Sequence, residues 1–175
     1  MDMWTLMHAH RNIIRALNQM LKLNYLINMA QGVPTTYYYS DSSISTWIAT
    51  VSNTPNPEKV YTIGLVQYEA FTSLSEMQSF NTEAMKLGVM GTTIIVPSGD
   101  RGVLKDYIDA TTNTRYLDCG YFAQFPASSP YVTAIGGTMG PELNNPEVTG
   151  TSCTQTTNQI TSGGGFSVLK RVTVH

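Results

Sequence analysis

A short loop, Ser98-Gly99-Asp100-Arg101-Gly102, carries the residues whose types and spacing are best suited to chemistry. It directly follows the apolar run Thr92–Val96, which is typical of a buried parallel strand. The working loops of a parallel sheet leave the carboxyl ends of its strands, and glycines there let a substrate approach the backbone closely. Asp100 would then present its carboxyl group to a cleft. The alternative is a plain turn whose aspartate bonds its own backbone.

A second candidate is the glycine run in Ser162-Gly163-Gly164-Gly165-Phe166-Ser167. Three successive glycines can line a groove or cradle a phosphate, but a phosphate loop needs a preceding strand, a lysine and a following helix. The sequence around Gly164 fits that pattern poorly, so a nucleotide site is not predicted. A weaker run, Gly136-Gly137-Thr138, is typical of a turn after a strand.

The two cysteines, Cys119 and Cys153, lie in loop-like sequence rich in Thr, Asn and Gly. Their spacing is compatible with one disulfide and equally with two inert thiols. The three histidines, His8, His10 and His175, are far from the cysteines along the chain. A zinc site needs more ligands than these residues offer, so no metal site is predicted.

Charge and composition argue against two classes of partner. The 175 residues carry ten Lys and Arg against twelve Asp and Glu, with no basic block, so nucleic acid is not an expected partner. No stretch of about 18 apolar residues occurs, so no membrane-spanning helix is expected.

The start, Met1-Asp2-Met3-Trp4, lacks the basic and apolar regions of a signal peptide. The length suits one domain with its own core.

The spacing of apolar residues and caps predicts alternating helices and strands. Helices are expected at His8–Ala30 with Gly32 as its cap, from the Asp41–Ser43 caps through Val51, and from Ser73 to about Leu87. Strands are expected at Thr35–Tyr39, Val60–Val66, Thr92–Val96 and Tyr131–Ile135. Beyond Gly102 the pattern loosens into loops. The alternation is the signature of an α/β domain with a parallel sheet.

Four segments together resemble the sedolisin family of serine-carboxyl peptidases, which includes tripeptidyl-peptidases and pepstatin-insensitive acid peptidases. They are Asn81–Lys86, the Ser98–Gly102 loop, Phe125–Thr138 and Ile160–Ser167. They lie in the family's order with plausible spacing, and the resemblance covers roughly residues 14–169. It implies a three-layer, subtilisin-like parallel sheet with flanking helices, of which residues 1–175 would form an incomplete peptidase domain.

The family resemblance also implies roles for the two candidate segments. The family carries a Ser-Glu-Asp catalytic set and a separate oxyanion aspartate, which Asp100 matches. A protonated carboxyl group can donate a hydrogen bond to a tetrahedral intermediate, so such a site favours acidic surroundings. The substrate groove would be lined by Ser98, Gly99, Gly163, Gly164 and Gly165. Arg101, where the family more often has a small residue, would favour the ionised form of Asp100 if the two side chains are close.

The catalytic helix of the family departs from its pattern here. The family's Glu and Asp lie four residues apart on one helix face, and alignment on Leu21 and Tyr25 places them at Asn18 and Lys22. Asn18 cannot take a proton from a nucleophile, and Lys22 brings the opposite charge to the orienting position. These two positions are therefore expected to be degenerate.

Other parts of the family pattern are expected to lie outside this chain. These are the N-terminal strands, the leader and the propeptide, and also the Gly-Thr-Ser-Ala-type segment with the nucleophile and the calcium site that follows it. Ser152 precedes the glycine run and is followed by Cys153, so it is interpreted as a loop serine. No cofactor is therefore expected in this chain.

The resemblance favours a disulfide between Cys119 and Cys153, because cysteines flank this block in similar relatives, and it implies a secreted or lysosomal location. A peptide or protein would be the substrate. The expected function is that of a truncated, inactive sedolisin-type peptidase. One alternative is a pseudoenzyme that serves as a peptide-binding or interaction module. Another is an α/β interaction domain that keeps the motifs only for their turns.

Overall fold

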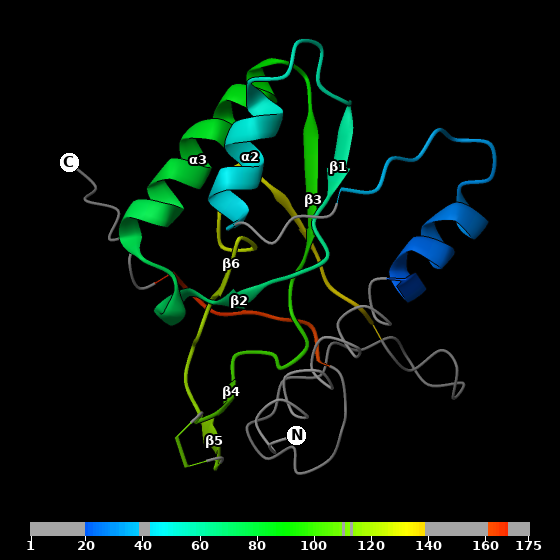
Figure 1. Cartoon of the computed structure of the whole chain (residues 1–175). Helices are drawn as coiled ribbons and strands as arrows, with labels where there is room; N and C mark the ends of the chain where they lie inside the picture. The colour runs from blue at the N-terminus through cyan, green and yellow to red at the C-terminus, as the bar shows by residue number, and fades with distance from the viewer. Residues whose placement is uncertain (1–19, 39–42, 110, 113, 139–160, 168–175) are drawn as a thin grey trace, which may run out of the picture. The chain divides into compact units, whose positions relative to one another are not determined.

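The computed structural model describes residues 20–38, 43–109, 111–112, 114–138 and 161–167 (Figure 1). The chain divides into two compact units, Met1–Asp41 and Ser42–His175, which are described separately. Within the described residues, no helix is long and apolar enough to cross a membrane. The described residues also contain no group of three or more His, Cys, Asp or Glu side chains that could hold a metal ion.

The first unit contains a helix over residues 20–29. The Ala30 amide closes its last turn on the carbonyl of Leu26 at 2.9 Å, and Gly32 then adopts a φ of +80°. That left-handed conformation suits glycine and confirms Gly32 as the cap. The predicted helix start at His8 lies outside the described residues. The predicted strand at 35–39 is wrong over residues 35–38, which form no strand, because an aromatic and β-branched run becomes a strand only when it finds a partner.

A three-stranded parallel sheet forms the centre of the second unit. The middle strand β3 (Thr93–Pro97) lies between β1 (Val60–Thr62) and β7 (Thr133–Ile135), so the α/β class with a parallel sheet is confirmed (Figure 1). The predicted strand at 60–66 is too long. The chain leaves β1 after Thr62, and residues of β2 (Gln67–Tyr68) pair instead with the antiparallel β6 (Gln124–Phe125).

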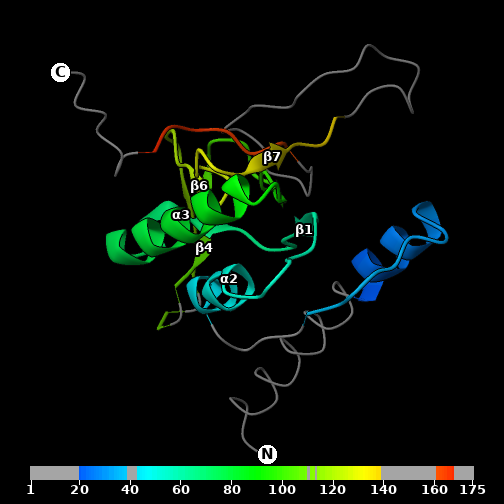
Figure 2. The ribbon, with the colours of Figure 1, turned by 90° about the horizontal axis from the view of Figure 1, so that it is seen from above.

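Two capped helices lie side by side in this unit (Figure 2). Helix α2 (Ile44–Ser52) begins after Ser43, whose Oγ accepts the Thr46 amide at 3.2 Å. Helix α3 (Leu74–Val89) begins after Ser73 in the same way, which confirms both predicted starts. Because α3 runs two residues beyond Leu87, Gly88 is helical and Gly91, with a φ of +77°, takes the left-handed position after the helix. The second helical layer of a three-layer arrangement stays a prediction.

The core of this unit lies between α2, α3 and the sheet. Its centre is Phe80 of α3, whose ring meets that of Phe125 edge to face with centroids 5.1 Å apart. The helix register explains the burial, since apolar residues three or four positions apart share one face. The buried residues that form this core cluster are Ile48, Val51, Tyr61, Met77, Phe80, Ala84, Leu87, Ile94, Val96 and Phe125.

A β-hairpin occupies the region where the sequence predicted only loops. Its strands are β4 (Lys105–Ile108) and β5 (Arg115–Asp118), which pair antiparallel. At the turn, the Asp109 carboxylate accepts the amides of Thr111 and Thr112 at 2.8 and 2.9 Å. The strands are short, and their charged and apolar residues do not alternate, so the sequence pattern gives no strand signal for them. A single 3₁₀ turn, η1 (Glu69–Phe71), precedes α3.

Candidate functional site

The Ser98–Gly102 loop leaves the carboxyl end of β3, as predicted for a working loop of a parallel sheet. The Ser98 amide donates to the carbonyl of Ile135 at 2.9 Å, which ties the loop to the end of β7. Gly99 has a φ of +105°, and a Cβ there would lie 2.2 Å from the Gln124 side chain. A side chain at position 99 would therefore be both strained and blocked, which explains the glycine.

The glycine-rich residues Thr161–Ser167, here called the glycine segment, lie alongside this loop. The Thr161 amide donates to the Asp100 carbonyl at 2.9 Å, and the Gly102 amide returns a bond to Thr161 at 3.1 Å. The Gly163 amide donates to Gly99 at 3.0 Å and the Gly164 amide to Gly102 at 3.1 Å. The tertiary structure thus brings together the two segments that the sequence singled out separately.

Gly163 lies directly against the backbone of Ser98. Its amide also donates to the Ser98 Oγ at 3.0 Å. A Cβ at this position would lie 1.7 Å from the Ser98 carbonyl oxygen, a distance that no side chain can occupy. The glycine is therefore required by the backbone contact itself, which is the use of glycine that lets two chains approach closely.

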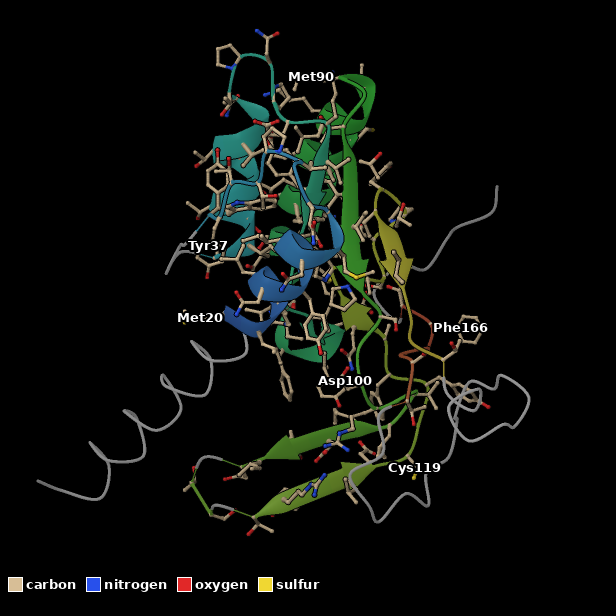
Figure 3. The ribbon with its side chains drawn as sticks, turned by 90° about the vertical axis from the view of Figure 1, so that its right-hand side faces the viewer. Met20, Tyr37, Met90, Asp100, Cys119 and Phe166 are labelled. Atoms are coloured by element: carbon tan, nitrogen blue, oxygen red, sulfur yellow. The ribbon has the colours of Figure 1, made fainter. Side chains whose placement is uncertain are left out.

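Asp100 stands at the junction of β3 and the hairpin with its side chain exposed (Figure 3). Among the described residues, its carboxyl group takes part in no hydrogen bond or ion pair. A turn aspartate bonded to its own backbone would have shown such a bond. The arrangement instead leaves the carboxyl group of Asp100 accessible beside the loop and the glycine segment.

Arg101 directs its guanidinium group into the hairpin. Its Nε lies 3.2 Å from Oδ2 of Asp106. Arg115 donates two further hydrogen bonds to the same carboxylate, from Nε to Oδ1 at 2.8 Å and from a terminal guanidinium nitrogen to Oδ2 at 2.6 Å. The hydrogen bonds from Arg115 hold the pKa of Asp106 below its ordinary value, against burial, and the charges of Arg115 and Arg101 add to this effect. The predicted electrostatic effect of Arg101 on the Asp100 carboxyl group therefore competes with the ion pair that Arg101 already forms with Asp106.

Tyr68 contacts the same cluster from β2. Its hydroxyl oxygen accepts the Asp106 amide at 2.9 Å, and burial raises the pKa of this tyrosine. The hairpin is consequently attached both to the loop through Arg101 and to the β2–β6 pair through Tyr68. The hairpin therefore helps to hold the Ser98–Gly102 loop in place.

The Asp106 ion pairs predict a pH-dependent hairpin. Because the folded pKa of Asp106 is lowered, its stabilising contribution is complete above the ordinary aspartate pKa of about 3.9 and is lost as the pH falls through the lower folded value. We expect Asp106→Asn to speed hydrogen exchange of the Asp109 amide, which donates to Thr114 at 2.9 Å, at neutral pH. The ratio of variant to wild-type exchange should shrink below about pH 4. A ratio that grows with acid would contradict this assignment.

Glu69 is a buried acidic residue that the sequence analysis missed. Its side chain is 2% exposed, and Oε1 accepts hydroxyl groups from Ser128 at 3.1 Å and from Ser167 at 2.6 Å. Ser167 ends the glycine segment, 98 positions away in the sequence. No local pattern marks a glutamate after a two-residue strand as buried, so this contact is visible only in the tertiary structure.

The other predicted site residues lie on other segments of the chain. Lys22 lies exposed on the helix of the first unit, and Asn18 lies outside the described residues. Cys119 is exposed after β5, whereas Ser152 and Cys153 also lie outside the described residues, so the disulfide stays a prediction.

A surface groove of about 490 Å³ lies elsewhere in the second unit. It is lined by residues of α3, β3 and β7, including Met85, Val89 and Thr133. Neither the loop nor the glycine segment contributes to its lining. Volume alone is a weaker indicator of function than convergent polar groups, so we place the candidate site at the loop rather than at the groove.

Comparison with known proteins identifies similar peptidases. No protein-family model matches the chain. It is 32% identical over 158 residues to tripeptidyl-peptidase 1 of Pongo abelii and 31% identical over 156 residues to those of Rattus norvegicus and Homo sapiens. Each alignment covers 84% of this chain and 25% of the relative, so the chain spans about a quarter of the length of these relatives.

A solved structure of a Pseudomonas protein is also similar. It is described as a sedolisin, a serine-carboxyl proteinase, complexed with two molecules of pseudo-iodotyrostatin. The two sequences are 26% identical, and the match covers 71% of this chain and 33% of that chain with a TM-score of 0.49.

Proposed function

We propose that this chain, which belongs to the sedolisin family of serine-carboxyl peptidases, supplies the peptide-binding face of such a peptidase. The family follows from the 32% sequence identity to tripeptidyl-peptidase 1 in an alignment that covers 84% of the chain. The observation that carries the proposal is the backbone pairing of the Ser98–Gly102 loop with the glycine segment, which leaves the Asp100 side chain exposed beside it. The substrate class is a peptide or an unfolded protein segment.

The chemistry of the glycine segment suits an extended peptide. An extended backbone can add a peptide along its edge through main-chain hydrogen bonds, and such binding tolerates many side-chain sequences. Gly164 and Gly165 are exposed, and without side chains they let a peptide backbone come close. These features support the proposed role of Gly163, Gly164 and Gly165 as groove residues, together with Ser98 and Gly99 of the paired loop.

Asp100 has the proposed role of an oxyanion donor. In its protonated form a carboxyl group donates a hydrogen bond to a peptide carbonyl oxygen, and in its ionised form it repels that oxygen. An exposed aspartate at the carboxyl end of a parallel strand is in the right part of an α/β fold for this contact. Binding through Asp100 should therefore strengthen in acid, which suits a secreted or lysosomal setting.

Hydrolysis by this chain is not part of the proposal. Asn18 lacks the basicity that a proton acceptor requires, and Lys22 replaces an orienting carboxylate by a cation. We therefore assign peptide binding, and not hydrolysis, to this chain. It would act either as a pseudoenzyme or as part of a peptidase whose catalysis depends on other residues.

The test compares wild-type protein with Asp100→Ala and Asp100→Asn. Binding of a fluorescein-labelled peptide is measured by anisotropy from about pH 3 to about pH 7, since the acid form must donate. We expect Asp100→Ala to weaken binding about two- to tenfold at acidic pH, the worth of one hydrogen bond, and to have little effect at neutral pH. Asp100→Asn, whose amide donates at every pH, should bind with little pH dependence.

A quenched fluorogenic peptide is followed in the same samples, with folding checked by circular dichroism. We expect no turnover. Acid turnover that disappears in Asp100→Ala would overturn the interpretation of Asn18 and Lys22. Folded wild-type protein that binds no peptide at any pH would refute the proposed function and favour an interaction domain of another kind.

A further inference from the structure

Glu69 is an acidic side chain with 2% exposure in the second unit, and its position is set by its own backbone. The Glu69 amide donates to the Ala123 carbonyl at 2.9 Å, which fixes η1 against the chain just before β6. Burying a carboxyl group is unfavourable unless it is hydrogen-bonded. The partners of Glu69 therefore indicate why a carboxyl group stands there.

Two serines donate to the same oxygen, Oε1 of Glu69. Ser128 lies in the turn after β6, where its amide also donates to Gln124 at 2.8 Å. Ser167 is the last residue of the glycine segment and makes the shorter contact, at 2.6 Å. Glu69 thus joins the glycine segment to a part of the fold that is already held by β2, β6 and the core.

The glycine segment needs such a connection. Successive glycines lose more conformational freedom on ordering than any other residues, so they stay in one register only when both ends are held. One end is held at Thr161 by its backbone bonds to Asp100 and Gly102. Further along, the Phe166 amide donates to Tyr121 at 3.3 Å, a long bond, and Phe166 itself is exposed.

We propose that Glu69 is a positioning residue: through Ser167 it holds the far end of the glycine segment, and so keeps Gly163 and Gly164 in register with the Ser98–Gly102 loop. Its importance for peptide binding rests on the function proposed above. The contact between Glu69 and Ser167 connects the buried core to the candidate groove without touching the peptide. Glu69 is therefore not itself a catalytic residue.

The two serines provide a matched test. Ser167→Ala and Ser128→Ala each remove one hydroxyl group from Oε1 of Glu69, but only Ser167 lies on the glycine segment. The readout is hydrogen exchange of the Gly163 and Gly164 amides, which donate to the loop. We expect Ser167→Ala to speed their exchange roughly tenfold, as loss of one hydrogen bond to a carboxylate allows local opening, and Ser128→Ala to change it less than about twofold.

A second pair of variants distinguishes loss of the hydrogen bond from misfolding. Glu69→Gln keeps a side-chain oxygen that can accept the Ser167 hydroxyl, whereas Glu69→Ala removes it. We expect exchange in Glu69→Gln to stay near the wild-type rate and exchange in Glu69→Ala to match that in Ser167→Ala. Amides in the middle of α3, such as that of Phe80, should be unchanged in Ser167→Ala. If Glu69→Ala does not fold, Ser167→Ala and Ser128→Ala still test the positioning role of Glu69.

Peptide binding by the same proteins separates this inference from the proposed function. Faster exchange of Gly163 and Gly164 in Ser167→Ala, with peptide affinity lowered in proportion, supports both. The same faster exchange in a protein whose wild type binds no peptide supports the positioning role and refutes the proposed function. Wild-type exchange in Ser167→Ala, or equal effects of the two serine variants, would overturn the positioning role.

Discussion

A Gly163→Ala variant is expected to lose the pairing between the glycine segment and the loop, and with it peptide binding. The added Cβ would lie 1.7 Å from the Ser98 carbonyl oxygen and 3.2 Å from the Gly99 amide nitrogen, and both atoms belong to the backbone. Neither can move aside without displacing the Ser98–Gly102 loop from the end of β3. Overpacking of this kind costs about 1–3 kcal/mol, so peptide affinity should fall by about five- to a hundredfold.

The neighbouring Gly164→Ala is the matched control. Its Cβ would meet only Cγ1 of Val103 at 3.3 Å, a side-chain atom that can shift by a few tenths of an ångström. Exchange of the position-163 amide, which reports the pairing with the loop, should therefore stay close to wild type in Gly164→Ala and become faster in Gly163→Ala. Equally fast exchange in the two variants would show that the backbone contact of Gly163 is not what holds the segment against the loop.

The largest effect on stability is expected from Phe80→Ala. Phe80 is 0% exposed, lies in α3 and meets Phe125 edge to face, so its removal leaves a cavity at the centre of the core. Phenylalanine-to-alanine substitutions in cores typically cost 3–5 kcal/mol, so we expect a loss of about 4 kcal/mol in the free energy of unfolding. Urea denaturation followed by circular dichroism measures it.

Phe71→Ala provides the comparison for Phe80→Ala. Phe71 is largely exposed, and its ring forms T-shaped pairs with the rings of Tyr68 and Tyr107. Its loss should cost about 1 kcal/mol or less, the worth of aromatic pairs near a surface. Similar midpoints for the two variants would mean that the second unit has no single core centred on Phe80 and Phe125.

Local signals in the sequence located the helices of the second unit. The sequence predicts caps within Asp41–Ser43 and at Ser73, and the structure places them at Ser43 and Ser73. Such caps are predictable because a serine hydroxyl satisfies an amide that the first helical turn leaves without a partner, and this contact spans only three residues. The strand expected at residues 35–38 failed for the opposite reason. Strand formation depends on a partner elsewhere in the chain, which composition does not reveal.

The hairpin of β4 and β5 was missed for a related reason. Its stability comes from cross-strand contacts, such as the stacked rings of Tyr107 and Tyr116 and the ion pair of Asp106 with Arg115. These residues follow no apolar alternation along the chain. Their pairing becomes apparent only when the two strands are laid against each other.

The candidate site shows the same division. Adjacent residues were sufficient to predict that the Ser98–Gly102 loop follows a buried strand and that the glycine run suits close backbone approach. The contacts of Gly163 with Ser98 and of Glu69 with Ser167 became apparent only in the folded chain. They join residues far apart in the sequence, so their free energy is gained only when the core has brought the segments together. The pair of Arg101 with Asp106 spans five positions but depends on the hairpin that orients the Asp106 side chain.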